Sequence, residues 1–300
     1  VGLIYGLVAL ALFISFSILN IADLSTDGCF TLGCAVGAML TIAGHPILAL
    51  FAAMAAGMLS GYVTAFLQTR LGVESILAGI ISNTGLYTIN LAVMGFSSNV
   101  SITGVDTVFS LFKGLVGGQW SRLILLALIA AVLVLVLIRF FGTSLGLSIR
   151  ATGDSLDMVS ASSINPKATI TIGLCLANAL TALSGCLIGE YNKFCDINLG
   201  TGMVTIALAS LIIGEVFAGR RGSVGKRVVC VVLGSIVYRF IIALALRLNI
   251  SAEYFKLVSA VIVAVAIAAP NMKDYVHLAK IKSNARKLRA LSGKGDETDA

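Results

Sequence analysis

Residues 123–141 read LILLALIAAVLVLVLIRFF and contain a single charged side chain, Arg139, close to their end. The hydrocarbon layer of a bilayer is about 30 Å thick, and a helix of ~20 apolar residues crosses it. This run therefore predicts a membrane-spanning helix. The whole chain has the same character, since 58% of its 300 residues are hydrophobic, 12% are charged and the mean hydropathy is +1.01. A water-soluble domain has roughly a quarter of its residues charged, so the composition excludes that class.

Further apolar segments of about this length lie on both sides of residues 123–141. We predict an all-α polytopic membrane protein with about nine spans (eight to ten). The segments are residues 1–19, 29–43, 47–67, 76–94, 123–141, 168–188, 203–218, 228–246 and 255–269. The second is short and rich in glycine, which makes it a candidate for a broken or re-entrant helix. Residues 1–270 are expected to form the transmembrane domain, and residues 271–300 a basic cytoplasmic tail.

Lysine and arginine are distributed unevenly between the two sides that this arrangement creates. Cytoplasmic loops of membrane proteins carry an excess of these residues. With the N-terminus outside and the C-terminus inside, 15 of the 21 basic residues fall in the cytoplasm. We therefore predict this orientation. The net charge of +7 then lies mainly in the cytoplasmic loops and tail, where topology and attraction to anionic lipid explain it. We therefore expect no nucleic-acid partner.

Catalytic and metal-binding patterns are scarce. Residues 219–227, GRRGSVGKR, come nearest to a phosphate-binding loop, but Arg220 stands where glycine is needed and Arg227 where serine or threonine binds Mg²⁺. The two histidines, His45 and His277, lie in loops on opposite sides of the membrane, and the six cysteines form no Cys-x-x-Cys pair. We expect no enzymatic activity, no cofactor and no metal site in this chain.

Glycines recur at a spacing of four within several predicted spans. Small residues at this spacing let helices pack closely in lipid. The pairs are Gly2/Gly6, Gly33/Gly37, Gly57/Gly61 and Gly185/Gly189. Together they predict a compact helical bundle.

A few polar side chains fall inside the predicted spans. Arg239 is the one charge deep within a span, and Asn178 falls at a similar depth in a neighbouring span, so the two are candidates for pairing or for contact with a substrate carboxylate. Asn83 and Asn90 are further candidates for the pathway, or for hydrogen bonds between helices.

Residues 142–167, GTSLGLSIRATGDSLDMVSASSINPK, form a long connection on the predicted cytoplasmic side. We place Asp154 as the N-cap of a short helix, with Asp157 three residues on, and Asn165-Pro166 as its end. Spacing alone leaves two interpretations open. The helix either docks into a groove on a cytoplasmic partner or is an ordinary connection.

Several short motifs occur in a characteristic order: Arg150-Ala-Thr-Gly-Asp154, Ile164-Asn-Pro-Lys167, Leu183-Ser-Gly185, Leu211-Ile-Ile-Gly214 and Gly222-Ser-Val-Gly225. This order resembles the permease subunits of bacterial ABC importers of the branched-chain amino acid and ribose type, over roughly residues 1–270. The hexapeptide DLSTDG at residues 23–28 and the ending YRFIIALALRL at residues 238–248 resemble the branch that is paired with aromatic amino acid binding lipoproteins.

The resemblance implies a multi-pass permease of the bacterial inner membrane that works as a homodimer or with a close paralogue. Two separate ATPase subunits would bind ATP and Mg²⁺ beneath it. An extracytoplasmic binding lipoprotein would deliver an amino acid, with an aromatic one favoured, to outer loops that include residues 97–121 and 191–202. Residues 142–167 would correspond to the coupling helix, with these candidate contacts to the ATPase: Arg150, Gly153, Asp154, Asp157, Ser160, Ala161, Ile164, Asn165 and Pro166.

The alternative function is an ion-coupled secondary transporter of small solutes. Such proteins normally carry acidic residues inside the membrane or paired broken helices, and Glu215 is the only acid that we place well within a span, near its inner end. Many members of the resembled family have glycine at this position. We expect Glu215 to pair with Arg220 or Arg221 in a structural role.

Overall fold

The computed structural model describes residues 1–118, 120–219, 222–247, 257, 260–261 and 264. Apart from loops and two short strands, the described chain is helical. In chain order the elements are α1 (Gly2–Leu12), the π-helix η1 (Phe13–Ile18), α2 (Thr26–Ile42), α3 (Pro46–Thr69), α4 (Ser75–Val93), β1 (Asn99–Ser101), α5 (Val108–Val116), α6 (Ser121–Phe141), α7 (Ser144–Asp154), α8 (Leu156–Ala161), α9 (Pro166–Asn192), β2 (Phe194–Asp196), α10 (Met203–Ala218) and α11 (Val224–Arg247).

Each of the eight spans predicted within residues 1–247 coincides with an apolar helix. Among the described residues, α3, α4, α6, α9 and α11 are long and apolar enough to cross a membrane, and three shorter apolar segments accompany them: α1 with η1, α2, and α10. The predicted class of helical membrane protein is thus confirmed. The ninth predicted span, residues 255–269, and the tail, residues 271–300, lie outside the described residues apart from isolated positions. The orientation of the termini remains a prediction.

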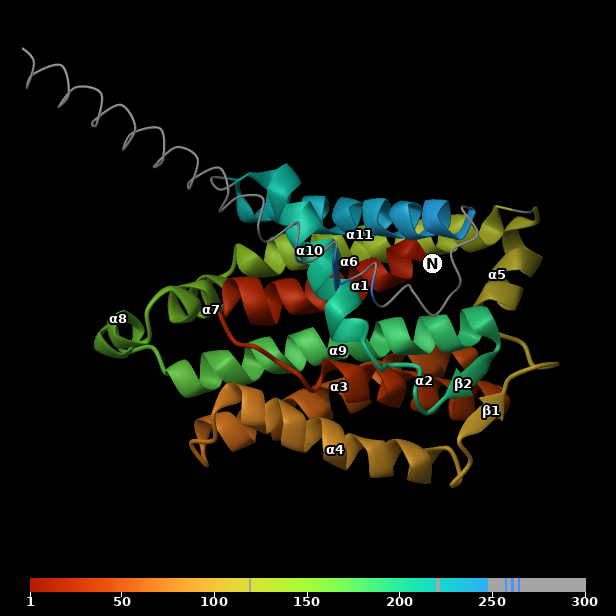
Figure 1. Cartoon of the computed structure of the whole chain (residues 1–300), viewed down its shortest axis with the longest axis horizontal. Helices are drawn as coiled ribbons and strands as arrows, with labels where there is room; N and C mark the ends of the chain where they lie inside the picture. The colour runs from red at the N-terminus through yellow and green to blue at the C-terminus, as the bar shows by residue number, and fades with distance from the viewer. Residues whose placement is uncertain (119, 220–221, 248–256, 258–259, 262–263, 265–300) are drawn as a thin grey trace, which may run out of the picture.

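Helix α9 is the centre of the bundle. It has α2, α3 and α4 on one side and α1, α6, α10 and α11 on the other (Figure 1). Its most apolar 18-residue window is 83% buried, against 28% in α4 and 22% in α6. It packs directly against α1, α2 and α3. A displacement of α9 must therefore be accommodated by three other helices.

Glycines bring the neighbouring backbones close to α9. A Cβ added at Gly185 of α9 would lie 1.9 Å from the carbonyl oxygen of Phe30, and one added at Gly33 of α2 would lie 1.9 Å from that of Ala182. Gly57 of α3 meets the α9 backbone in the same way. These distances are far below van der Waals contact, so a side chain at these positions would force the helices apart. The close packing predicted from the glycine spacing is confirmed here.

Two of the short helices begin inside the bundle. The non-helical residues 19–25 return from the end of η1 into the protein, and Asp23 in this segment bonds to Asn178, close to the middle of the 27-residue α9. Helix α2 therefore starts at mid-depth, as expected for a broken helix. The first turn of α10 contacts Asp27, in the first turn of α2, so α10 also starts at this depth. The sequence had not predicted the second break.

The two ends of the bundle carry different structures. Helices α7 and α8 lie at one, hereafter the coupling end, while α5 and a two-stranded ribbon lie at the other, the ribbon end (Figure 1). The ribbon pairs β1 with β2 in antiparallel register, Val100 opposite Cys195. The all-α prediction missed it because strands of three residues are too short to show an alternating pattern. It joins the two loops that the sequence placed outside.

Candidate functional site

A polar cluster lies in the middle of the bundle, where α2 begins. The carboxylate of Asp23, 3% exposed, accepts hydrogen bonds from the backbone N–H and the hydroxyl of Ser25 at 2.8 and 2.6 Å. It also accepts one from Nδ2 of Asn178 at 2.9 Å. Non-helical backbone at membrane depth is tolerated only where protein or water surrounds it. Asp23 meets that condition by joining residues 19–25 to the central helix.

The carboxylate of Asp27 joins the two interrupted helices. Its two oxygens accept hydrogen bonds from the backbone N–H groups of Gly202 and Val204, each at 2.9 Å. The N-terminus of a helix carries unpaired N–H groups and a partial positive charge, and Asp27 sits in the first turn of α2 while it caps α10. Asp27 therefore accepts hydrogen bonds from the unpaired backbone N–H groups at the start of α10. In some transporters a helix start of this kind binds an anionic substrate instead.

Three of the four intramembrane candidates gather around the start of α2. Asn90 donates a hydrogen bond to the carbonyl oxygen of Gly28 at 3.0 Å, and a Cβ on Gly28 would lie 2.6 Å from Oδ1 of Asn83. Asn178 bonds to Asp23 from the opposite side. The structure thus brings Asn83, Asn90 and Asn178 together as contacts between helices.

Arg239 is held elsewhere. Its guanidinium lies 4.0 Å from the centroid of the Tyr5 ring in α1, and its side chain passes beside Gly2. A desolvated cation over an aromatic ring is worth about 2 kcal/mol, which offsets part of the cost of a charge at this depth. The Arg239 side chain contacts α1, whereas the Asn178 amide donates hydrogen bonds to Asp23 and to the carbonyl oxygen of Leu174. The pairing of Arg239 with Asn178 that was considered from the sequence is not among these contacts.

Glu215 forms an ion pair, but with a different arginine from those expected. Its Oε1 lies 2.6 Å from Nη2 of Arg227, which also donates to the hydroxyl of Ser17 at 2.6 Å, and that hydroxyl donates to Glu215. Arg227 lies in the first turn of α11, which follows α10 in the chain, and is within reach of the carboxylate. Arg220 and Arg221 lie outside the described residues. The trio connects α10 and α11 to the π-helix η1.

The sequence reasoning missed three further carboxylates inside the bundle. Asp23 and Asp27 were treated as part of a polar turn, although two acids and two hydroxyls among six residues between apolar runs were a usable signal. Glu190 was missed because the predicted span stopped at residue 188, whereas α9 continues to Asn192. Glu190 is 1% exposed and accepts hydrogen bonds from Oγ1 of Thr41 and the backbone N–H of Val108.

Residues 142–167 form two helices with boundaries that differ from the predicted ones. Asp154 ends α7, and the N-cap of α8 is Ser155, whose hydroxyl accepts a hydrogen bond from the N–H of Met158. Asn165 caps the start of α9 through Lys167 N–H at 3.0 Å, and α8 has already ended at Ala161. The two predicted boundaries were wrong because serine caps as well as aspartate does and because Pro166 is suited to the first turn of a helix.

One side of this coupling segment is fixed to the bundle. Ile149 and Val159 are buried, and the hydroxyls of Thr152 and Thr169 lie 2.8 Å apart, which joins α7 to α9. A Cβ added to Gly153 would lie 1.8 Å from the carbonyl oxygen of Ile18 in η1. The segment is thus in tight contact with both η1 and α9.

The other side of the coupling segment is exposed. Leu156 and Met158 of α8 are 53% and 54% exposed. Six of the nine candidate contact residues are exposed, namely Arg150, Asp154, Asp157, Ser160, Ala161 and Asn165, and the other three, Gly153, Ile164 and Pro166, are partly buried. This surface combines small, apolar and acidic groups at the coupling end.

The cap at Asp27 generates a prediction for stability. In Asp27→Asn the amide oxygen can still accept one of the two hydrogen bonds, but the NH₂ group faces the other backbone N–H and cannot accept from it. A hydrogen bond to a charged group is worth about 1.5–3 kcal/mol. We expect a clear fall in the unfolding temperature of the detergent-purified protein, measured by differential scanning fluorimetry. Asp106→Asn, at an exposed carboxylate of the ribbon end, is the control and should change it little. Equal shifts for both variants would contradict the assigned role.

Comparison with known proteins places the chain in a family. A family described as branched-chain amino acid transport system / permease component matches residues 1–267. A tyrosine transport system permease protein of Clostridioides difficile (strain R20291) is 31% identical over 294 residues, which cover 98% of this chain and 95% of that protein. An uncharacterized protein of Rickettsia prowazekii (strain Madrid E) is 30% identical over 268 residues, 88% of this chain and 93% of that protein. No solved structure matches.

The family match covers both the coupling segment and the polar cluster, so it applies to the parts of the chain that carry the geometry described above. It also agrees with the resemblance drawn from the motifs between residues 150 and 225. The chain belongs to the permease family of branched-chain amino acid transport systems and is a transmembrane ABC transporter permease.

Proposed function

We propose that two permease copies, this chain with itself or with a paralogue, form the translocation pathway of an ATP-driven importer of amino acids. The favoured substrate is an aromatic amino acid, because the tyrosine transport permease matches nearly the whole chain. The N-terminus lies outside and the coupling end faces the cytoplasm of a bacterial cell, as the distribution of lysine and arginine favours.

The observation that carries the proposal is the two-sided coupling segment. Its exposed face, with Leu156, Met158, Ser160 and Ala161, fits a groove on an ATPase subunit, and its buried face contacts η1 and α9. ATP and Mg²⁺ would be bound by the ATPase subunits. Closure of these subunits would push on α8, and the push would reach α9 through the Thr152–Thr169 contact.

Movement of α9 would change access to the pathway. Because α9 packs against α1, α2 and α3, a shift of its position is a shift of the bundle, and alternating access is a two-state change of this kind. At the opposite end an extracytoplasmic binding lipoprotein would dock on the ribbon and α5, which lie on the two loops predicted to be outside.

The alternative, an ion-coupled secondary transporter, has one observation in its favour. Asp23 and Glu190 are acids buried within the bundle, and such residues often bind coupling ions. Here each carboxylate accepts hydrogen bonds from the protein itself, three at Asp23 and two at Glu190. Their geometry fits caps and ties between helices better than an open ion site.

Bulky residues on the exposed face of α8 test the coupling role. The double variant Ser160→Trp/Ala161→Trp should lose ATPase association, and transport should fall at least tenfold, because the added rings occupy the docking surface. Co-purification with the ATPase subunit and uptake by cells are the measurements. Ser98→Trp, exposed at the ribbon end, is the control for ATPase association. If the double variant still co-purifies with the ATPase and still transports substrate at the unmodified rate, the coupling assignment is wrong.

The complete assembly tests the function. Purified gently through this chain, it should contain an ATPase subunit at about one copy per permease, identified by mass spectrometry. Its ATP hydrolysis should rise when the binding lipoprotein and an aromatic amino acid are both added, and should not rise with the amino acid alone. A chain that purifies without any ATPase would contradict the importer proposal.

A further inference from the structure

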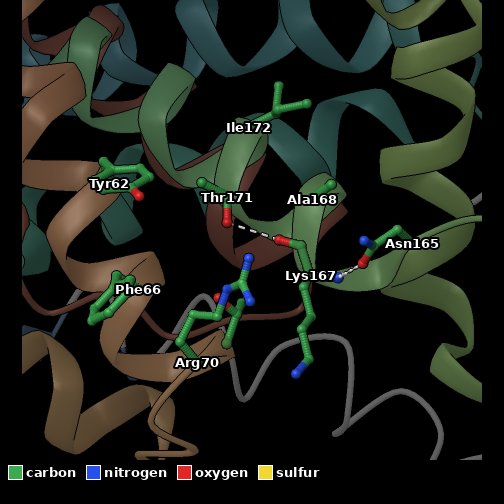
Figure 2. Close-up of a pocket in the computed structure, with 9 residues that line it drawn as sticks. Tyr62, Phe66, Arg70, Asn165, Lys167, Ala168, Thr171 and Ile172 are labelled. Atoms are coloured by element: carbon green, nitrogen blue, oxygen red, sulfur yellow. Dashed lines mark hydrogen bonds between the residues drawn. The ribbon is translucent and has the colours of Figure 1, made fainter.

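A pocket of about 340 Å³ opens between the last turns of α3 and the first turns of α9. Figure 2 shows Tyr62, Phe66 and Arg70 of the α3 side facing Lys167 and Thr171 of α9. The pocket lies at the coupling end, since α3 ends and α9 begins there. We refer to it as the α3–α9 pocket.

The polar part of the α3–α9 pocket is cationic. Arg70 and Lys167 are both exposed, and neither side chain makes a hydrogen bond or an ion pair with the part of the chain that the structure describes. Among the described residues that line the pocket there is no carboxylate. A zwitterionic amino acid would find cations for its carboxylate but no carboxylate among these residues for its ammonium group. The charge therefore favours an anion without a neighbouring cation.

Three of the lining residues, Tyr62, Phe66 and Ile172, form an apolar wall that lies deeper in the span than the two cations. Tyr62, Phe66 and Ile172 are 52%, 43% and 38% exposed, and the two rings lie 6.4 Å apart along one face of α3. At 1.5 Å per residue, Tyr62 is roughly 12 Å below Arg70 along its helix, and Ile172 is roughly 8 Å beyond Lys167. A ligand that fills the pocket meets cations at the membrane surface and apolar side chains towards the bilayer interior.

We propose that the α3–α9 pocket binds an anionic phospholipid, with its phosphate between Arg70 and Lys167 and an acyl chain against Tyr62, Phe66 and Ile172. Guanidinium and ammonium groups are the usual protein partners of phosphate. Basic pockets between helices on the cytoplasmic side of a membrane bind anionic headgroups. A free phosphate would satisfy the two cations but leave the apolar wall unused.

The bound lipid would join two parts that the coupling segment moves. Asn165, which caps α9 where the coupling segment ends, also lines the pocket. A headgroup held by Arg70 and Lys167 would thus bridge the end of α3 to the start of α9. The proposal concerns lipid alone and holds whichever solute the chain transports.

Native mass spectrometry of the delipidated, detergent-purified chain tests the proposal. Phosphatidylglycerol and phosphatidylcholine with the same acyl chains are added in parallel titrations, and inorganic phosphate is added as a competitor. The test variant is Arg70→Gln/Lys167→Gln. The matched control, Arg139→Gln/Lys226→Gln, removes the same charge from exposed side chains at the same end but outside the pocket.

We expect one phosphatidylglycerol per chain to bind more tightly than phosphatidylcholine by about thirtyfold, because the two cations attract the net negative headgroup of the first lipid, whereas choline neutralises the phosphate of the second. The preference should fall to less than about threefold in the pocket variant, as expected when most of that attraction is removed, and persist in the control. Equal binding of the two lipids by the unmodified chain would overturn the proposal. An equal loss of the phosphatidylglycerol preference in both double variants would also overturn it, because general surface charge would then explain the binding. Displacement of the lipid by millimolar phosphate would overturn it as well.

Discussion

The fold depends on one constraint: every backbone polar group that lies away from water must find a partner inside the protein. Two helices of this chain, α2 and α10, begin in the middle of the bundle, so their first N–H groups cannot be solvated. Asp27 satisfies the start of α10, and Asp23 joins the segment before α2 to α9. These two carboxylates make it possible for a membrane protein to contain irregular backbone at mid-depth.

The same arrangement explains how distant parts of the chain are connected. Helix α9 carries Asn178 at its middle, Thr169 near its start and Glu190 near its end. Through these residues it contacts the polar cluster, the coupling segment and the ribbon end respectively. Since α9 is also the most buried of the long helices described, a displacement of its start at Thr169 would reach much of the bundle.

Much of this architecture follows from the sequence because lipid imposes a simple rule. An apolar run of about 20 residues has few alternatives to a membrane helix, so the eight apolar segments up to residue 246 were predicted correctly as helices, as was the close approach at Gly33 and Gly185. The resemblance to a permease family was carried by short motifs such as Ile164-Asn-Pro-Lys167 and was equally sound. Here the local sequence alone determines the structure.

The sequence failed where tertiary structure decides the environment. The polar hexapeptide at residues 23–28 reads as a surface turn, and only the packing of α4, α9 and α10 around it makes it the centre of the protein. The buried position of Glu190 was missed because α9 continues four residues beyond its predicted apolar run. The partner of Glu215 depended on where α11 begins, and the ribbon depended on pairing between segments more than 90 residues apart in the chain.

The central claim is that energy enters this permease through the coupling end. The most direct measurement is uptake of labelled tyrosine by proteoliposomes that contain the whole assembly, with ATP sealed on the side of the coupling end and the binding lipoprotein on the other. The account predicts accumulation that requires both ATP and the lipoprotein and is unaffected when the ion gradients are collapsed. Uptake of the same extent driven by an ion gradient without ATP would contradict it.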